Sequence, residues 1–267
     1  MDWSPGYREQ APPAELRPSV SCVWARVAGP GETAAVAVLP DACIDLIWQQ
    51  GHGVFVAGPD TGPAPSVSPP GTMMAGVRFA PGGGGPALGM PLSELLDLRV
   101  DAAELGSGQA AELARVDGGL PPAEALRLLV RITAEMVTDG PADPLVTRAV
   151  RLLGPPAARF HGGQLPGGPA RLPDDPAAQA EEVAGQLGVS ERQLRRRCQA
   201  AVGYGPATLR RVLRFRRFLS WMDTSGRPPF DLATAAAEFG YADQAHLTRE
   251  SVRLAGLPPA ALRQARS

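Results

Sequence analysis

The chain contains no lysine, and all 26 of its basic residues are arginine. Cysteine is also scarce: Cys22, Cys43 and Cys198 lie far apart in the sequence, with no CxxC pair. This spacing argues against a disulfide framework or a zinc cluster and favours a reducing compartment. No apolar run approaches the length of a membrane span, and the first ten residues lack the basic-then-apolar order of a secretory signal. We therefore expect a globular cytoplasmic protein.

Histidine is equally rare, and this bears on enzyme chemistry. A metal-dependent enzyme needs several histidine or carboxylate ligands that converge on one ion. The three histidines are His52 in an expected loop, His161 in an expected linker and His246 on an expected helix. They predict no metal site, and we expect no cofactor. Cys43 has only His52 as a candidate base, so a buried structural cysteine is the favoured interpretation over a nucleophile.

The net charge of −1 hides two halves of opposite sign. Residues 177–267 contain 14 arginines against 8 acidic residues, whereas residues 1–176 contain 12 against 19. A basic half is the natural partner of a polyanion, although chance imbalance on solvated faces is the alternative. Hydrophobic residues make up 44% of the chain, which is enough for the cores of one large domain or two ordinary ones.

Residues 1–106 have the pattern of a β-rich domain. Short runs with β-branched or aromatic residues are separated by Gly, Pro and Asp, which predicts a small β-barrel or sandwich of the cupin-like kind. The expected strands are 20–26, 34–39, 43–48, 54–57 and 72–80.

Charged residues lie on these expected strands. Asp41 and Asp45 bracket an apolar strand in the segment LPDACIDLIW, and Arg78 lies in another strand, GVRF. A buried Asp–Arg pair would pin the domain or bind a polar ligand, and the structural role is the favoured one. The candidate pocket or core residues are Trp24, Asp41, Asp45, Trp48 and Arg78.

The middle of the chain is expected to be a helical bridge, residues 107–153. It follows a Gly/Pro loop at 81–90 and short helices at 91–96 and 101–105. Helical periodicity predicts helices at 122–137 and 144–153, with core packing favoured over a dimer surface. Residues 154–176 are expected to be a mobile linker, because 11 of these 23 residues are Gly or Pro.

The stretch from Glu182 to Val202 predicts a helix, a turn and a second helix. Ser190 and Gln193 have the spacing of a capping box at the start of the second helix. One face of that helix is apolar, with Leu194, Cys198 and Ala201, and the opposite face is polar, with Arg192, Arg195, Arg196 and Gln199. This is the pattern of a DNA recognition helix, because guanidinium groups contact phosphates and guanine edges.

A weaker copy of this unit follows at 231–256, with Asp243 as the expected N-cap of its second helix. A helix from Pro206 to about Met222 joins the two copies, and Arg214 and Arg217 on it are expected to contact phosphates. One helix-turn-helix match is a weak signal, and two in tandem are a much stronger one.

The last 90 residues resemble the AraC/XylS family of bacterial transcription regulators. The resemblance lies in LGVSERQLRRRC, VGYGP and RFRRFL in the first copy, and in AAAEFGYADQAHLTRE and AGLPP in the second. It implies a DNA-binding domain of seven helices. The base-facing residues it implies are Arg192, Arg195 and Arg196 in the first copy, and Gln244, Ala245, His246, Thr248 and Arg249 in the second. The family usually has a large apolar residue where this chain has Ser251. The N-terminal part resembles an uncharacterised sensor-type domain.

These observations predict an α+β protein of several domains that regulates transcription. Residues 1–106 would sense a small-molecule effector or mediate assembly as a homodimer, and residues 177–267 would bind double-stranded promoter DNA in the nucleoid. RNA polymerase would be a partner of an activator. The alternatives are a metal-dependent cupin-like enzyme fused to a DNA-binding module, and a DNA-binding module without a regulatory role. Two unlike reading helices on one chain predict an asymmetric site with its halves one helical turn apart.

Overall fold

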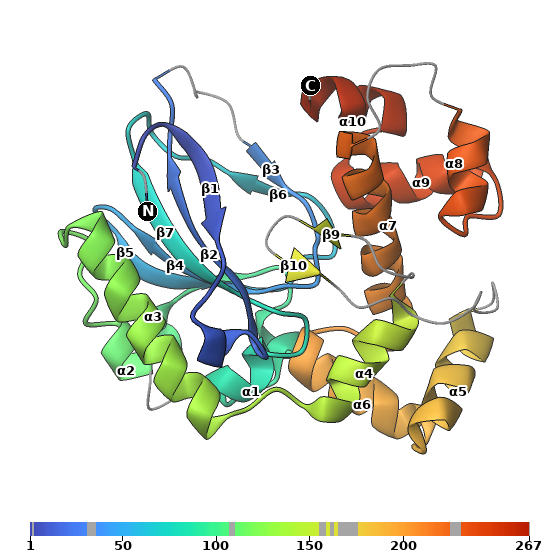
Figure 1. The fold of residues 1–267 in the computed structure, drawn as a ribbon, viewed down its shortest axis with the longest axis horizontal. Helices are drawn as coiled ribbons and strands as arrows, with labels where there is room; N and C mark the ends of the chain where they lie inside the picture. The colour runs from blue at the N-terminus through green and yellow to red at the C-terminus, as the bar shows by residue number, and fades with distance from the viewer. Residues whose placement is uncertain are drawn as a thin grey trace.

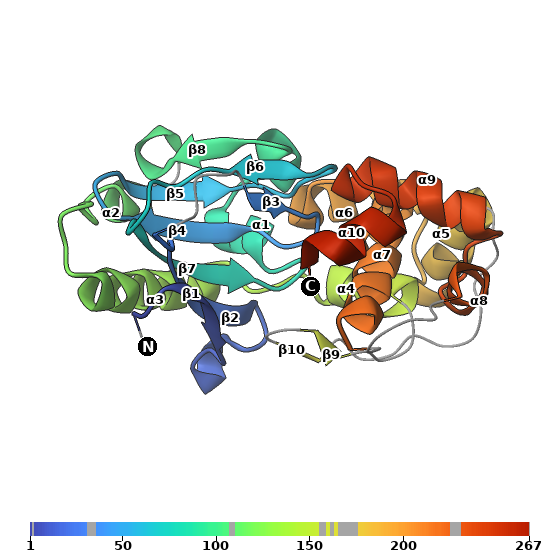
Figure 2. The same ribbon diagram turned by 90° about the horizontal axis from the view of Figure 1, so that it is seen from above.

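The computed structural model describes residues 1, 3–30, 36–106, 110–154, 159–160, 163–164, 176–224 and 231–266. The expected linker at 154–176 therefore lies largely outside the described residues. Figures 1 and 2 show a β-rich N-terminal part beside a helical C-terminal part. The expected α+β architecture is confirmed. No helix in the described part of the chain is long and apolar enough to span a membrane.

A six-stranded antiparallel sheet forms the N-terminal part, in the order β1-β2-β7-β4-β5-β8. A separate ribbon of two strands lies beside it (Figure 1). The expected strands are all present, and β1, β6 and β8 are additional short strands. The strands of the sheet are β1 (Gly6–Gln10), β2 (Val20–Val27), β4 (Asp45–Gln49), β5 (Gly53–Ala57), β7 (Met73–Phe79) and β8 (Arg99–Asp101), and those of the ribbon are β3 (Val36–Val38) and β6 (Ala64–Ser66).

Side chains alternate between the two faces of the sheet, as strand geometry requires. Leu46, Trp48, Val56 and Val77 lie on one face in a core that includes helix α3 (Pro122–Asp139). Figure 2 shows α3 lying along this face. The opposite face carries a smaller apolar cluster of Cys22, Trp24, Ile47 and Met74. The first face packs into the main core, whereas the second face carries only the smaller cluster.

The Gly-rich stretch expected to be a loop at 81–90 contains a short helix, α1 (Gly84–Leu88). The loop prediction was wrong here because tertiary packing outweighs glycine's low helix propensity. A Cβ on Gly84 would stand 2.4 Å from Ile44 Cδ1, and one on Gly85 would stand 2.4 Å from the carbonyl oxygen of Ala200. The glycines therefore allow a close approach between α1 and its neighbours.

Short helices complete the N-terminal part. The two that the sequence predicts at 91–96 and 101–105 are present as 3₁₀ helices. The short helices are η1 (Ala14–Leu16), η2 (Leu92–Leu95), η3 (Ala102–Glu104) and α2 (Ala110–Leu113), and a two-stranded ribbon further along the chain consists of β9 (Arg159–Phe160) and β10 (Gly163–Gln164).

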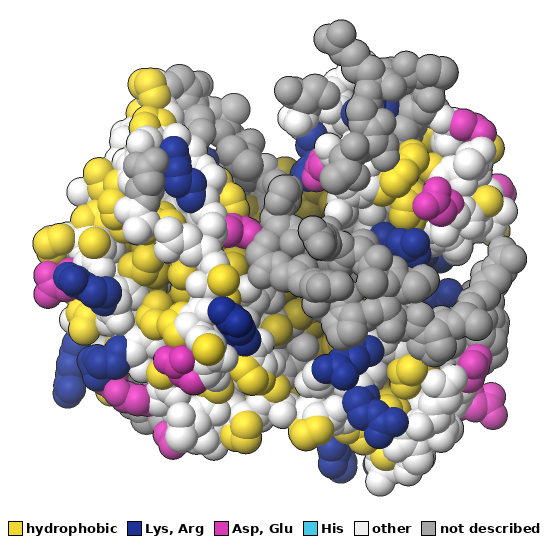
Figure 3. Space-filling model, viewed as in Figure 1, with side chains coloured by type: hydrophobic (Ala, Val, Ile, Leu, Met, Phe, Trp, Pro, Cys, Tyr) yellow, Lys and Arg dark blue, Asp and Glu magenta, His cyan; other side chains and the backbone are white. Residues whose placement is uncertain are grey.

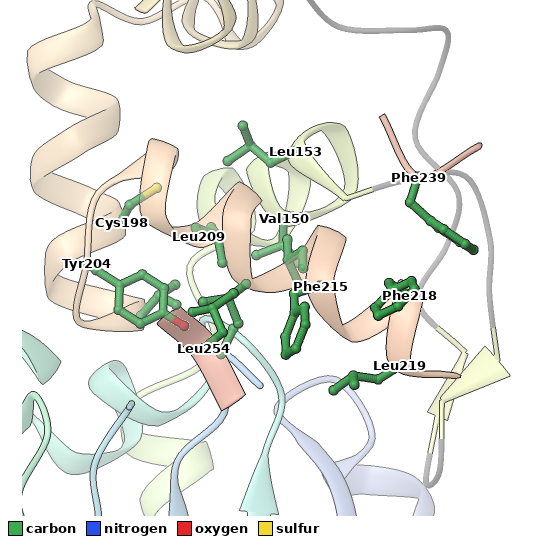
Figure 4. Packing of buried hydrophobic residues seen from close by; sticks show 14 of the residues in the cluster. Val150, Leu153, Cys198, Tyr204, Leu209, Phe215, Phe218, Leu219, Phe239 and Leu254 are labelled. Carbon is green, nitrogen blue, oxygen red and sulfur yellow. The ribbon is translucent and has the colours of Figure 1, made fainter. Parts of the chain in front are cut away.

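Seven helices form the second core. Helix α4 (Pro144–Leu153) packs into it through Val146, Val150 and Leu153, whereas α3 packs onto the sheet. Figure 4 shows Val150 and Leu153 beside Leu209 and Phe215 of α7. The remaining helices are α5 (Pro176–Leu187), α6 (Glu191–Val202), α7 (Pro206–Thr224), α8 (Leu232–Glu238), α9 (Gln244–Ala255) and α10 (Pro259–Arg266).

We predict that Gly76→Ala destabilises the protein. The indole of Trp24 lies over Gly76 of the neighbouring strand, and an added Cβ would stand 2.4 Å from Trp24 Cε2. Overpacking of this kind costs about 1–3 kcal/mol of unfolding free energy, which thermal or urea unfolding measures.

Gly185→Ala is the control, because Gly185 is exposed on α5 with nothing within 4 Å of a new Cβ. This change should leave stability equal or raise it by up to about 1 kcal/mol. Equal unfolding curves for Gly76→Ala and the wild type would contradict the packing described.

Candidate functional site

The first reading helix is α6, which begins at a complete capping box. Ser190 Oγ accepts the Gln193 backbone N–H, and the Gln193 side chain accepts the Ser190 backbone N–H. This confirms the start that the sequence predicts. Leu194, Cys198 and Ala201 are almost fully buried. The opposite face is exposed along its length, with Arg192, Arg195, Arg196 and Gln199.

The remaining arginine of α6 has a different position. Arg197 donates to both carboxylate oxygens of Asp143, each at 3.1 Å, and Asp143 is the N-cap of α4. It therefore ties α6 to α4 at the edge of the exposed face. Figure 3 shows arginines gathered over this α4–α6 region of the surface.

The second reading helix is α9. Asp243 caps it by accepting the backbone N–H of His246 at 2.6 Å, as the sequence predicts. Leu247 and Leu254 are buried beneath the helix. Two of the five expected base-facing residues are only half-exposed. The exposed ones are Gln244, Ala245 and Arg249, and the half-buried ones are His246 and Thr248.

Helix α9 is continuous at Ser251, where the family usually has a large apolar residue. The Ser251 side chain is fully buried, and Oγ donates to the carbonyl oxygen of Leu257 at 2.7 Å. The hydrogen bond closes the turn after the helix and satisfies the buried hydroxyl. Val252 is 47% exposed beside it, which is the outward position expected from helical periodicity.

His246 is held by its neighbours. Its Nδ1 accepts the backbone N–H of Ala242 at 3.3 Å, and the ring meets Tyr241 edge-on. Partial burial, together with the nearby positive charge of Arg214, lowers the pKa of His246 below its ordinary value. The imidazole is therefore neutral near pH 7 and offers hydrogen bonds without charge.

Arg214 does not lie where a phosphate contact requires. Its side chain is 16% exposed and donates to the carbonyl oxygen of Gly240 at 2.8 Å. Its guanidinium carbon lies 4.0 Å from the centre of the Tyr241 ring, and Glu250 is 3.7 Å away. Arg214 therefore fastens α7 to the turn between α8 and α9. The sequence could not reveal this, because the sequence pattern around an arginine on a helix is the same whether its side chain faces solvent or a neighbouring turn.

Arg217 is half-buried, with its guanidinium carbon 5.2 Å from the centre of the Phe239 ring. Its guanidinium therefore lies over an aromatic face, an arrangement that attracts a cation.

A second feature is a cavity of about 560 Å³ between the outer face of the sheet and the β3–β6 ribbon. Trp24, Asp41, Asp45 and Arg78 line it as the sequence suggested. Trp48 does not. It is fully buried on the opposite face of the sheet, where its indole N–H donates to the carbonyl oxygen of Asp117 at 2.9 Å. Trp48 and Asp45 are three residues apart, so they point to opposite faces.

The floor of the cavity is a cross-strand network. Asp45 and Arg78 are direct neighbours on β4 and β7, and Arg78 Nε lies 3.1 and 3.2 Å from the two Asp45 oxygens. The Trp24 indole N–H crosses over Gly76 and donates to Asp45 at 2.6 Å. An ion pair on two strands and an indole N–H on a third are thus held together under the cavity.

The two aspartates at Arg78 titrate in opposite directions. Burial raises the pKa of Asp45 above its ordinary value, and the positive charge of Arg78 offsets this only in part. Burial also acts to raise the pKa of Asp41, but Arg78 and Arg216 outweigh it, and the result is a lowered pKa. Asp41 is therefore ionised near pH 7 and is the more persistent charge.

Sequence reasoning missed the wall of the cavity opposite β1. Arg99 on β8 pairs with Asp60 through two hydrogen bonds of 2.9 and 2.8 Å, and Asp60 is 8% exposed. His52 and Asp101 form a second pair at 2.8 Å. The strand β8 has only three residues, which is too short for a hydrophobic alternation to stand out.

The groups considered for catalysis lie apart. Within the described residues, no group of three or more His, Cys, Asp or Glu side chains is placed to hold a metal ion. Cys43 is buried, and burial raises the pKa of its thiol well above the ordinary value. His52 pairs with Asp101 rather than with this thiol.

Two family models match the chain. Residues 8–101 match a domain of unknown function (DUF6597), and residues 183–265 match a helix-turn-helix domain. No curated protein matches the sequence.

Solved structures of ToxT from Vibrio cholerae are similar to this chain at low identity. An apo variant from strain SCE256 has a TM-score of 0.43 and 11% identity, and covers 96% of this chain and 99% of its own. A form solved at 1.65 Å has a TM-score of 0.44 and 9% identity, with 97% and 98% covered. At these scores the likeness carries no argument about function.

The helix-turn-helix match covers both capped helices, and each presents a polar face outside a buried apolar row. Residues 183–265 therefore form a helix-turn-helix DNA-binding domain. Its two capped helices are joined by one long helix, and a β-rich domain precedes it in the chain.

We predict that Arg214→Ala lowers the free energy of unfolding by about 2 kcal/mol. The change removes a hydrogen bond from a charged donor and leaves buried partners without it. Thermal unfolding of the full chain measures the loss.

Arg217→Ala is the matched control on the same helix. It should lower the slope of log K for DNA binding against log salt concentration by about one, with little loss of stability. A salt-slope change for Arg214→Ala at unchanged stability would contradict the structural role.

Proposed function

We propose that this chain is a transcriptional regulator of the AraC type, that it reads promoter DNA with α6 and α9 together, and that its N-terminal cavity holds a small-molecule effector. The observation that carries the proposal is the pair of capped helices with exposed polar faces, held on one helical core. Its role is regulatory rather than catalytic, and it acts at nucleoid DNA in the cytoplasm.

In this proposal, residues 1–106 form the sensing or assembly domain and residues 177–267 form the DNA-binding domain. The base-reading residues are those with exposed side chains, which are Arg192, Arg195, Arg196 and Gln199 on α6 and Gln244, Ala245 and Arg249 on α9. His246 and Thr248 contribute at the rim of the second face. Arg217 contacts phosphate. RNA polymerase, for an activator, and a second copy of the chain complete the set of proposed partners.

The geometry of α7 supports a site with two unlike halves. The helix has 19 residues, which at 1.5 Å per residue is about 28 Å. Successive major grooves on one side of DNA repeat about every 34–36 Å. Helix α6 leads directly into α7, and α9 contacts α7 through Glu250, which pairs with Arg211 and Arg214. With both reading helices held on α7, one protomer would reach two consecutive grooves. Three arginines on one helix and a mixed set on the other would read different bases.

The experiment begins with genome-wide mapping of binding sites for the full chain, followed by footprinting on the best site. We predict that Arg195→Ala weakens binding to this operator by about 5- to 150-fold, because a lost guanine contact costs about 1–3 kcal/mol. Binding to random DNA should change far less. Selection of binding sites from random sequences should show a weaker base preference at one base pair.

Arg197→Ala is the matched control, since it removes the same charge from the same helix on the side that faces Asp143. It should leave base discrimination intact. Equal losses on operator and random DNA for both variants would contradict base reading by Arg195, and a footprint of a single groove would contradict the two-helix site.

A further inference from the structure

The charges at the cavity floor are unequal. Arg78 lies among three carboxylates: its Nε contacts Asp45 at 3.1 Å, and its Nη1 lies 3.6 Å from Asp41 and 3.5 Å from Glu9. Only the Asp45 contact is a close pair. The charge of Arg216 also acts on Asp41, so two guanidinium groups face three carboxylates and this end of the cavity keeps an excess of negative charge.

The other basic side chains do not remove this excess. Arg99 is paired with Asp60, and Arg216 Nη1 donates to the Asp41 backbone carbonyl at 2.5 Å while its charge acts on the Asp41 carboxylate. Arg26 lies one row away along the sheet, opposite Tyr7 on β1. Four carboxylates and three arginines line the cavity, and Glu9 adds another carboxylate at Arg78.

Glu9 also has an unused acceptor. Its Oε1 accepts the Tyr7 hydroxyl at 2.7 Å, whereas Oε2 is buried and has no hydrogen-bond partner in the described part of the protein. Buried carboxylate oxygens are nearly always paired, and an unpaired one is costly. A group with N–H donors and positive charge would relieve this cost, and a ligand carboxylate would increase it.

Aromatic and apolar side chains form the rest of the floor. The rings of Tyr7 and Trp24 lie 5.7 Å apart at 38°, and Phe55, Ile47 and Met74 lie alongside. Aromatic faces attract cations, and the flat, apolar surface accepts a planar body.

We propose that the effector of this cavity is an organic cation, an amine or amidine on an aromatic or apolar body, with its charged end toward Asp41, Asp45 and Glu9. This inference rests on the proposed effector role of the cavity. The ligand's N–H groups would supply the donor that Glu9 Oε2 lacks, and its body would cover Trp24 and Tyr7.

The test uses three probes of one shape on the full chain: benzamidine as the cation, benzamide as the neutral form and benzoate as the anion. Calorimetry should detect benzamidine binding and find benzamide weaker and benzoate weaker still. Glu9→Gln and Asp41→Asn should each weaken benzamidine binding at least about fivefold, because hydrogen bonds to charged groups contribute that much or more. Glu94→Gln, on an exposed 3₁₀ helix, is the matched control and should change nothing.

Benzoate binding as tight as benzamidine, or no benzamidine binding at all, would overturn the cation assignment. Neither result bears on DNA reading, which is measured separately with the mapped operator and no probe. Failure of the wild-type chain to bind the mapped operator would instead overturn the proposed function.

A different set of contacts concerns the loop at residues 58–63, GPDTGP, between β5 and β6. The loop is anchored to the cavity wall through the Asp60–Arg99 pair. Thr61 adds two more bonds, from its backbone N–H and its hydroxyl to the Asp97 carboxylate, at 2.6 and 2.7 Å. The loop is therefore a fixed part of the cavity wall.

The other side of this loop contacts the C-terminal ends of both reading helices. A Cβ on Gly203, the C-cap of α6, would stand 2.4 Å from Pro59 Cγ. A Cβ on Gly256, the C-cap of α9, would stand 3.6 Å from Pro63 Cγ, and one on Gly62 would stand 3.7 Å from the carbonyl oxygen of Arg253. One six-residue loop thus contacts both helices that read DNA.

We infer that the loop at residues 58–63 transmits the state of the cavity wall to both reading helices at once. A change at the Asp60–Arg99 pair would move Pro59 and Pro63 together and so alter how α6 and α9 are held. This inference rests on the loop contacts and not on the class of the ligand.

Hydrogen exchange on the full chain tests the connection. Asp60→Asn should speed exchange at the Gly203 and Gly256 amides, which close the two helix ends by donating to Gln199 and Val252. Pro63→Ala, at an exposed position, should speed exchange at Gly256 and serves as the milder second variant.

Asp101→Asn is the matched control, because Asp101 lines the same cavity but pairs with His52 outside the loop. It should leave both helix ends unchanged. If Asp60→Asn alters exchange only within the sheet, or if Asp101→Asn alters the helix ends equally, the loop is not the connection.

Discussion

The apolar side of α7 is the constraint on which the reading surface depends. Leu209, Val212, Phe215 and Phe218 are fully buried along it, and both helix-turn-helix units pack against this one helix. Figure 4 shows Phe215 beside Val150 of α4, Leu209 near Leu254 and Phe218 near Phe239. Neither unit is large enough to bury a core alone, so each obtains its fixed orientation from α7. Arg214 adds a polar tie at the second unit, where helix α8 has only seven residues.

The sheet has a comparable dependence on strand alternation. Because neighbouring residues point to opposite faces, the same strands that build the core also deliver Trp24, Asp45 and Arg78 to the cavity. Gly76 must lack a side chain, since the indole of Trp24 crosses over it to reach Asp45. A buried charged network is tolerated there because its members neutralise one another in part and because a cavity rather than a packed layer lies above them.

Much of this was predictable from local patterns. The capping box of α6, the Asp243 N-cap of α9, the helix at 144–153 and the strands with clear alternation follow from short-range rules, and the structure has them where the sequence places them. Three features depend on contacts distant in sequence and carry no local signal: the helix within the glycines at 84–88, the inward turn of Arg214, and the wall built by Asp60 and Arg99. Trp48 was misplaced for a simpler reason, because a strand of five residues was treated as one cluster when its side chains divide between two faces.

The way α4 packs changes how the two halves of the chain are joined. The Gly/Pro-rich stretch at 154–176 connects α4 to α5, and both belong to the helical core. The link between the halves is instead the four residues from Gly140 to Asp143, between α3 on the sheet and α4 on the helices. Fully extended, four residues span roughly 13 Å. A short linker therefore joins the sensing and reading halves. It keeps the effective concentration of each half near the other high even when their interface opens. A cut or an insertion at 140–143 would free the halves, whereas the same change in the longer stretch would leave them joined.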